Sequence, residues 1–213
     1  MENPVLARLF ENYAELSYLR EDIMAAFEML KTCYSKGGKV LLCGNGGSAA
    51  DCEHIAGELL KGFKLRRSIN KYNLMAKFLQ AGAKEPEYFI SNLQGALPAI
   101  SLVSHSSLFT AWCNDVEPDL VFAQQVYGLG RGGDVLIAIS TSGNAKNVIN
   151  AVITAKAIGM KALALTGESG EELTRLCDAA IKVPSRETFR VQEYHLPIYH
   201  ALCEMLEISF FSD

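Results

Sequence analysis

The chain has 213 residues, of which 49% are hydrophobic and 21% charged, and its formal net charge is −4. This length supports one sizeable core, so we expect a single domain over 1–213. The negative charge disfavours a nucleic-acid partner, which a basic face would attract. No apolar run approaches the roughly 18 to 20 residues of a membrane span. Because a secretory signal is also missing at the N-terminus, we expect a cytoplasmic protein with no membrane contact.

The six cysteines are scattered and form no C-x-x-C pair or zinc-ribbon spacing. In the cytoplasm such residues are kept reduced, and we expect most of them in the core.

Residues 1–36 are expected to be helical, because Val5, Leu9 and Phe27 belong to apolar sets at helical spacing. Five short apolar runs are expected to form strands at 39–43, 98–103, 134–139, 161–165 and 179–183. Helices are expected at 48–60, 105–113, 119–129, 145–158 and 170–176, and a long C-terminal helix at 188–211. Apolar strands that alternate with helices predict a parallel five-stranded sheet in a three-layer α/β/α sandwich.

Residues 66–97 interrupt this alternation. Their apolar residues suggest one or two short amphipathic helices, with a link at 82–86 between them. A connection of this length serves as an oligomer contact, as a cap over a site, or as surface elaboration. The residues alone leave these three roles open.

Two short loops follow buried strands and open helices. The glycine loop (residues 43–48) reads Cys-Gly-Asn-Gly-Gly-Ser, and the serine loop (residues 139–144) reads Ile-Ser-Thr-Ser-Gly-Asn. Glycine lets backbone approach a ligand closely, and a helix N-terminus offers free N–H groups and a positive dipole end. The two loops are therefore expected to hold one phosphorylated ligand between them.

The glycine loop also matches the dinucleotide fingerprint G-x-G-x-x-[GA]. That fingerprint requires an acidic residue at the end of the next strand, about 20 residues further on. The chain has basic residues around 64–71 instead, and its next strand is followed by Ser104 and His105. We therefore expect no nucleotide cofactor.

Several side chains have the chemistry of a catalytic or metal site. His54 and Glu58 are four residues apart on one helix face, where they could bind a divalent metal, act as acid and base, or form a surface pair. Gln192 and His200 share one side of the last helix over two turns, with Pro197 between them. Asn114 and Asp115 follow the second strand and could be a helix cap or part of a site.

Taken together, these blocks resemble the sugar isomerase (SIS) domain family, and within it the phosphoheptose isomerases. The matching blocks are residues 38–48, 54–58, 114–115, 133–144, 165–167 and 190–195, with His200. The resemblance implies a flavodoxin-like SIS fold and an aldose–ketose isomerase that converts sedoheptulose 7-phosphate to glycero-manno-heptose 7-phosphate. It also implies a homotetramer with sites shared between subunits.

The same resemblance assigns roles to individual residues. Glu58 and His200 would be the acid/base pair, and one zinc ion per subunit would be bound by His54, Glu58, Gln192 and His200. The residues implied in substrate binding are Asn45, Gly46, Gly47, Ser48, Glu58, Asn114, Asp115, Ser140, Thr141, Ser142 and Gln192.

Three departures from the family pattern bear on the choice of sugar. Ala145 replaces a serine that contacts phosphate, Phe189 stands where some members have Asp, and 66–97 is longer than usual. A non-catalytic SIS module that senses sugar phosphates, and an isomerase of another phosphosugar, are the alternatives. The presence of both Glu58 and His200 favours catalysis.

Overall fold

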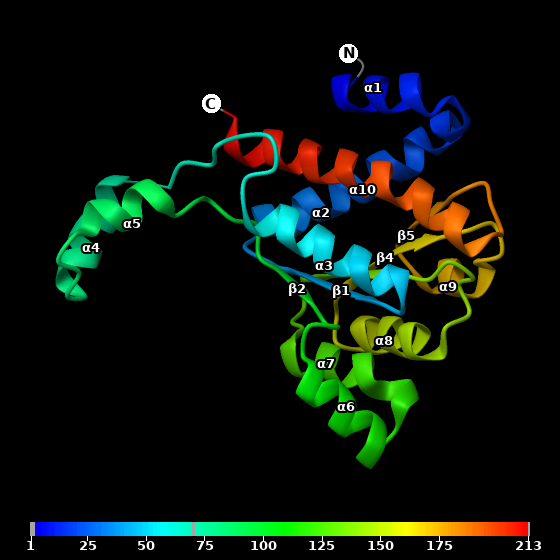
Figure 1. Cartoon of the computed structure of the whole chain (residues 1–213). Helices are drawn as coiled ribbons and strands as arrows, with labels where there is room; N and C mark the ends of the chain where they lie inside the picture. Colours follow the sequence, from blue (N-terminus) through cyan, green and yellow to red (C-terminus); the bar gives the residue numbers. More distant parts are fainter. Residues whose placement is uncertain (1–2, 70, 213) are drawn as a thin grey trace.

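The computed structural model describes residues 3–69 and 71–212, and its centre is one parallel sheet (Figure 1). The strand order is β2-β1-β3-β4-β5, and every neighbouring pair is parallel. The bounds are β1 Val40–Gly44, β2 Ala99–Ser101, β3 Val135–Ile139, β4 Lys161–Thr166 and β5 Ala179–Lys182. This is the flavodoxin-like order, which confirms the expected α/β class.

Helices cover both faces of the sheet. One face carries α2 (Arg20–Ser35), α3 (Gly47–Leu60) and α10 (Thr188–Phe211), with α1 (Pro4–Asn12) against α10. The other face carries α6 (Ser106–Asp115), α7 (Val121–Leu129), α8 (Lys146–Ala157) and α9 (Glu171–Leu176). Successive strand residues point to opposite faces, so Leu42 joins the first core and Leu41 the second.

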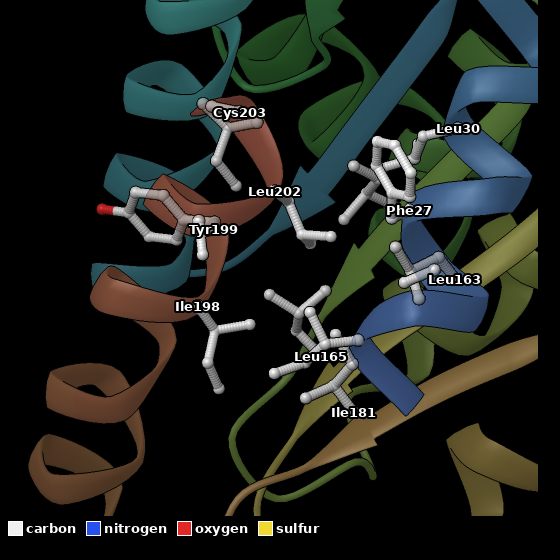
Figure 2. Close-up of a cluster of buried hydrophobic side chains, with 14 of the residues drawn as sticks. Phe27, Leu30, Leu163, Leu165, Ile181, Ile198, Tyr199, Leu202 and Cys203 are labelled. Carbon is white, nitrogen blue, oxygen red and sulfur yellow. The ribbon is translucent and has the colours of Figure 1, made fainter. Parts of the chain in front are cut away.

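The first core fixes α10 against the sheet. Figure 2 shows Ile198 and Leu202 of α10 facing Leu165 of β4 and Ile181 of β5. The hydroxyl of Tyr199 points away from this cluster, so the same turn of α10 serves both the core and a polar site beside it.

The N-terminal segment is helical, as expected, and it is divided at Tyr13. Tyr13 has φ −137° and ψ 69°, which ends α1, and a 3-10 segment at Ala14–Leu19 (η1) precedes α2. The break reorients the chain so that both α1 and α2 pack on α10. Periodicity of apolar residues cannot reveal such a break, because the buried positions continue at helical spacing through Leu16 and Leu19.

Other boundaries differ by a few residues. The edge strand β2 is shorter than the apolar run 98–103, since its pairing with β1 ends at Ser101. A short 3-10 segment, Pro118–Leu120 (η2), precedes α7 where one helix over 119–129 is expected. The C-terminal helix spans Thr188–Phe211 as expected and contains Pro197 without interruption.

Residues 66–97 form an arm that projects from the body beside the end of α10 (Figure 1). It contains α4 (Lys71–Gln80) and α5 (Pro86–Asn92), which pack against each other and stack Phe78 on Phe89. The backbone N–H of Gly95 donates to the Arg67 carbonyl at 2.9 Å, which closes the base of the arm. The expectation of one or two short helices is confirmed, and there are two, α4 and α5. Among the described helices, none has the length and apolarity needed to cross a membrane.

Candidate functional site

The two loops meet where the strand order reverses. From β1 the chain moves outward to β2 and then returns to β3 on the other side, so the carboxyl ends of β1 and β3 border the crevice in which such sheets bind ligands. A pocket of about 290 Å³ lies there. It is lined by Asn45, Gly46, Gly47, Ser48, Ile139, Ser140, Thr141, Ser142, Ala145, Thr188 and Gln192.

Three helices begin at this pocket. The N-terminal residues of α3, α8 and α10 are preceded by Gly46, Ala145 and Glu187, and none of these three caps its helix through a side chain. The first N–H groups of a helix have no partner within it. The pocket therefore offers free N–H groups and three positive dipole ends to an anion.

Glycine at two positions shapes the loops. Gly46 has φ +57° and Gly143 has φ +70°, a region that side chains disfavour. Within the serine loop, the Gly143 N–H donates to Ser140 Oγ at 3.1 Å and the Asn144 N–H donates to Ser142 Oγ at 3.3 Å. Both hydroxyls keep their own proton for a ligand.

A reciprocal amide pair joins the glycine loop to the first turn of α8. Asn45 Nδ2 donates to Asn147 Oδ1 at 2.9 Å, and Asn147 Nδ2 donates to Asn45 Oδ1 at 3.0 Å. This contact uses the Asn45 amide in holding α8 against the glycine loop. Asn147 was not singled out from the sequence, because nothing in its spacing shows a cross-loop partner.

Gln192 also lines the pocket between the two loops. Its amide packs so closely on Gly47 that a Cβ at position 47 would overlap it. Gly47 therefore creates the space in which the Gln192 amide sits, one turn into α10.

A second polar group lies further along α3 and α10. His54 Nε2 is 3.3 Å from Glu58 Oε1 and 3.4 Å from His200 Nε2. Lys61 Nζ is 3.4 Å from Glu58 Oε2. Two imidazoles and one carboxylate thus meet between the helices, as expected for an acid/base or metal site.

Tyr199 orients the His54 ring. Its hydroxyl donates to Asp51 Oδ1 at 3.4 Å and lies 3.0 Å from His54 Nδ1. The Tyr199 hydroxyl directs its proton at Asp51, so Nδ1 of His54 can donate to the Tyr199 oxygen. In that tautomer the lone pair of His54 lies on Nε2, the atom that faces Glu58 and His200. Such an outer partner is what holds metal-ligating or basic imidazoles in one tautomer.

The electrostatics favour neutral imidazole at His200. Burial and the neighbouring His54 lower the pKa of His200, an effect that Glu58 partly opposes. A neutral ring can accept a proton or ligate a cation.

The geometry of these residues bears on zinc binding. Ligands of a tetrahedral zinc with bonds near 2.0 to 2.1 Å are about 3.4 Å apart, which both His54 pairs match. Within residues 3–69 and 71–212, however, no three His, Cys, Asp or Glu side chains form a complete metal cluster. Imidazole and carboxylate are donor types that zinc prefers, and the two distances from His54 have the length of a ligand–ligand separation, while Gln192 lines the neighbouring pocket.

Asn114 and Asp115 are not among the residues that line the pocket. They lie at the end of α6, where Asn114 Nδ2 donates to Asp115 Oδ1 at 2.7 Å in an exposed position. Their role in substrate binding stays a prediction.

Thr188 and Tyr199 are site residues that the sequence did not indicate. Thr188 lines the pocket because α10 begins there, and a long helix gives no signal of where its first residue lies. Tyr199 precedes His200 and resembles an ordinary core aromatic.

The fold and the site define an α/β protein with a pocket of free helix N-termini at the switch point of its sheet and an imidazole–carboxylate group nearby. The model of the SIS domain matches residues 6–85 and 90–167. The chain therefore belongs to the SIS domain family.

Relatives within this family carry a more specific name. The chain is 38% identical to the phosphoheptose isomerase of Maridesulfovibrio salexigens over 95% of this chain and 82% of that protein. It is 45% identical to the phosphoheptose isomerase of a Nitratiruptor species over 81% of this chain and 78% of that protein. The solved structure of phosphoheptose isomerase from Neisseria gonorrhoeae aligns with a TM-score of 0.73 and 34% identity, over 95% of this chain and 94% of that one.

Proposed function

We propose that the protein is an aldose–ketose isomerase that converts sedoheptulose 7-phosphate to D-glycero-D-manno-heptose 7-phosphate. The observation that carries the proposal is the order in which the pocket and the acid/base residues follow one another along α3 and α10. Both helices begin at an anion pocket, and both carry an acid/base group further along. The names of relatives at 38% and 45% identity support the same reaction.

The spacing suits a long sugar phosphate. At 1.5 Å per residue, His54 lies about 9 Å along α3 from Ser48, which lines the pocket. A substrate with its phosphate at C7 and its reacting carbons at C1 and C2 needs these two ends apart. The serine loop, Ser48 and the three helix N-termini hold the phosphate in this arrangement.

The chemistry needs one carbon-bound proton to move between C1 and C2, and protons to exchange on the two oxygens. Glu58 takes the proton from C1 of the ketose and returns it to C2. His200, as a neutral imidazole, gives and takes the oxygen-bound protons. Lys61 pairs with the second oxygen of Glu58 and leaves the first facing His54.

We further propose that His54, Glu58, Gln192 and His200 bind one zinc ion. The ion would polarise the carbonyl and stabilise the enediolate. The Tyr199 contact to His54 Nδ1 supports this set, because it leaves Nε2 free to ligate. Metal analysis of the purified protein should give about one zinc per chain, and none for His54→Ala. His105→Ala, which removes a histidine bonded to Gln125 outside the site, is the control and should keep its zinc.

Cytoplasmic location and assembly into a homotetramer complete the proposal. Light scattering of the purified protein measures the assembly directly.

The test of the reaction is an NMR assay with sedoheptulose 7-phosphate in deuterated water. Appearance of an aldose anomeric proton, with deuterium at C2, establishes isomerisation by proton transfer. Binding of the sugar phosphate without turnover would instead identify a sensing module, and turnover of a different phosphosugar would correct the substrate.

A further inference from the structure

We propose that the buried Arg67–Glu207 ion pair is a positioning clamp that holds the Glu58 end of α3 and the His200 turn of α10 at a fixed separation. Arg67 and Glu207 touch neither loop of the pocket and have no part in the chemistry above. The expected effect of the clamp on kcat rests on the proposed function. Its expected effect on the end of α3 rests on the contacts alone.

Arg67 binds the end of the helix that carries Glu58. Its Nη1 donates to the Leu59 carbonyl at 2.6 Å, and its Nη2 donates to the Glu58 carbonyl at 2.8 Å. Carbonyls in the last turn of a helix have no partner within the helix. The guanidinium therefore caps α3 at the residue whose side chain faces His54.

Glu207 accepts hydrogen bonds from Arg67 and from the backbone that links α3 to Arg67. Its carboxylate accepts from Arg67 Nε at 2.8 Å and from the backbone N–H groups of Phe63, Lys64 and Leu65 at 2.7 to 3.0 Å. Both side chains of the pair have 0% exposure. Every donor around this carboxylate comes from the segment that follows α3, so Glu207 ties that segment to α10.

The clamp is in register with His200. Glu207 lies seven residues after His200 on α10, about two turns along the same face. The backbone N–H of Phe63 donates to Glu207, and the centroid of the Phe63 ring lies 5.3 Å from that of the His200 ring. Glu58 and His200 are thus linked through one continuous set of hydrogen bonds and one ring contact.

Stability alone is a weak reason for this arrangement. A buried ion pair is often no more stabilising than an apolar replacement, because desolvation offsets the attraction. Geometry gives a stronger reason, since misplacement of a reacting group by about 1 Å can cost about 100-fold in rate.

Arg67→Lys is the sharpest test. Lysine keeps the positive charge beside Glu207 but cannot bond the Glu58 and Leu59 carbonyls at the same time. We expect kcat to fall about tenfold while KM stays within about twofold, because the phosphate pocket lies at the other end of both helices. Hydrogen–deuterium exchange of the peptide over 55–61 should accelerate about tenfold.

Glu207→Gln is the second variant, and Asp134→Asn is its matched control. Asp134 is also a buried carboxylate that accepts from backbone N–H groups, of Lys39 and Arg131, and from the Lys39 ammonium. It precedes β3, and the hydrogen bonds of its carboxylate are to Lys39 and Arg131, which belong to neither α3 nor α10. The control should lose stability but keep kcat and the exchange of 55–61.

Unchanged kcat in folded Arg67→Lys and Glu207→Gln, or an equal loss of kcat in Asp134→Asn, overturns the clamp. If the wild type proves inactive on every sugar phosphate tried, the proposed function fails, and exchange decides the clamp by itself. Accelerated exchange over 55–61 in the two clamp variants alone supports it, and unchanged exchange overturns it.

Discussion

At the residue scale, the proposed site divides into a binding end and a reacting end. Ser142 belongs to the first, with its hydroxyl at the N-terminus of α8. Glu58 and His200 belong to the second, where the Glu58 side chain is only 13% exposed. Substitutions at the two ends should therefore separate KM from kcat.

Glu58→Gln and His200→Asn should each lower kcat at least about 100-fold, since each removes a group that transfers protons. Initial rates with sedoheptulose 7-phosphate measure this. Circular dichroism must show native helix content in both variants. Near-normal turnover in either one would remove that residue from the acid/base pair.

Ser142→Ala should raise KM about tenfold with kcat nearly unchanged. A hydrogen bond to a charged phosphate contributes about 1.5 to 3 kcal/mol. Ser17→Ala, which removes an exposed hydroxyl in η1, is the control and should leave KM unaltered. An unchanged KM in Ser142→Ala would contradict a phosphate contact at that hydroxyl.

At the element scale, α3 and α10 carry the site and the arm of residues 66–97 stands apart from it. The hydrogen bond from the Gly95 N–H to the Arg67 carbonyl closes the base of the arm, and the Arg67 side chain ties that base to Glu207 of α10. Its helices pack against each other and leave Leu79, Tyr88 and Leu93 about half exposed or more. Local opening of such an element has a low free-energy cost.

Amide exchange in α4 and α5 should therefore be faster than in α3 and α10. Peptide-resolved hydrogen–deuterium exchange over seconds to hours makes the comparison within one sample. Equally slow exchange in the arm would contradict this expectation and would mean that another copy of the chain covers its apolar residues.

At the scale of the whole molecule, the protonation of one core histidine links stability to pH. His195 has 0% exposure, and its ring lies against the backbone of Thr166, which only partly opposes the effect of burial on its pKa. Burial lowers the pKa of His195 to about 4 from the usual 6.5. The unfolded chain therefore binds a proton at a higher pH than the folded one does.

This sign means that stability is complete above pH 6.5 and falls as the pH drops from 6.5 towards 4. From pH 7 to pH 5 the loss due to His195 should be about 2 kcal/mol. Urea unfolding at the two pH values measures it. His195→Gln has no titrating ring and should lose about 2 kcal/mol less over the same range, and an equal loss in both proteins would contradict the assignment.

Much of the fold follows from local pattern. Val40–Gly44 and Val135–Ile139 are apolar throughout, which marks strands buried on both faces, and glycine-rich turns mark their ends. The break at Tyr13 and the start of α10 at Thr188 cannot be predicted from local pattern, because contacts with residues distant in sequence determine where these helices end and begin. The same division applies to the site, where Asn147 and Arg67 act through partners far away in sequence.

The sequence by itself determined the α/β class, the two anion loops and the residues able to transfer protons. These depend on residue type and short spacing, which the chain carries locally. Only the tertiary structure decided that three helix N-termini share one pocket, that His54 meets both Glu58 and His200, and that Arg67 caps the end of α3. The reason is physical: each of these depends on how α3 and α10 pack on the same face of the sheet, and packing is a property of the whole chain.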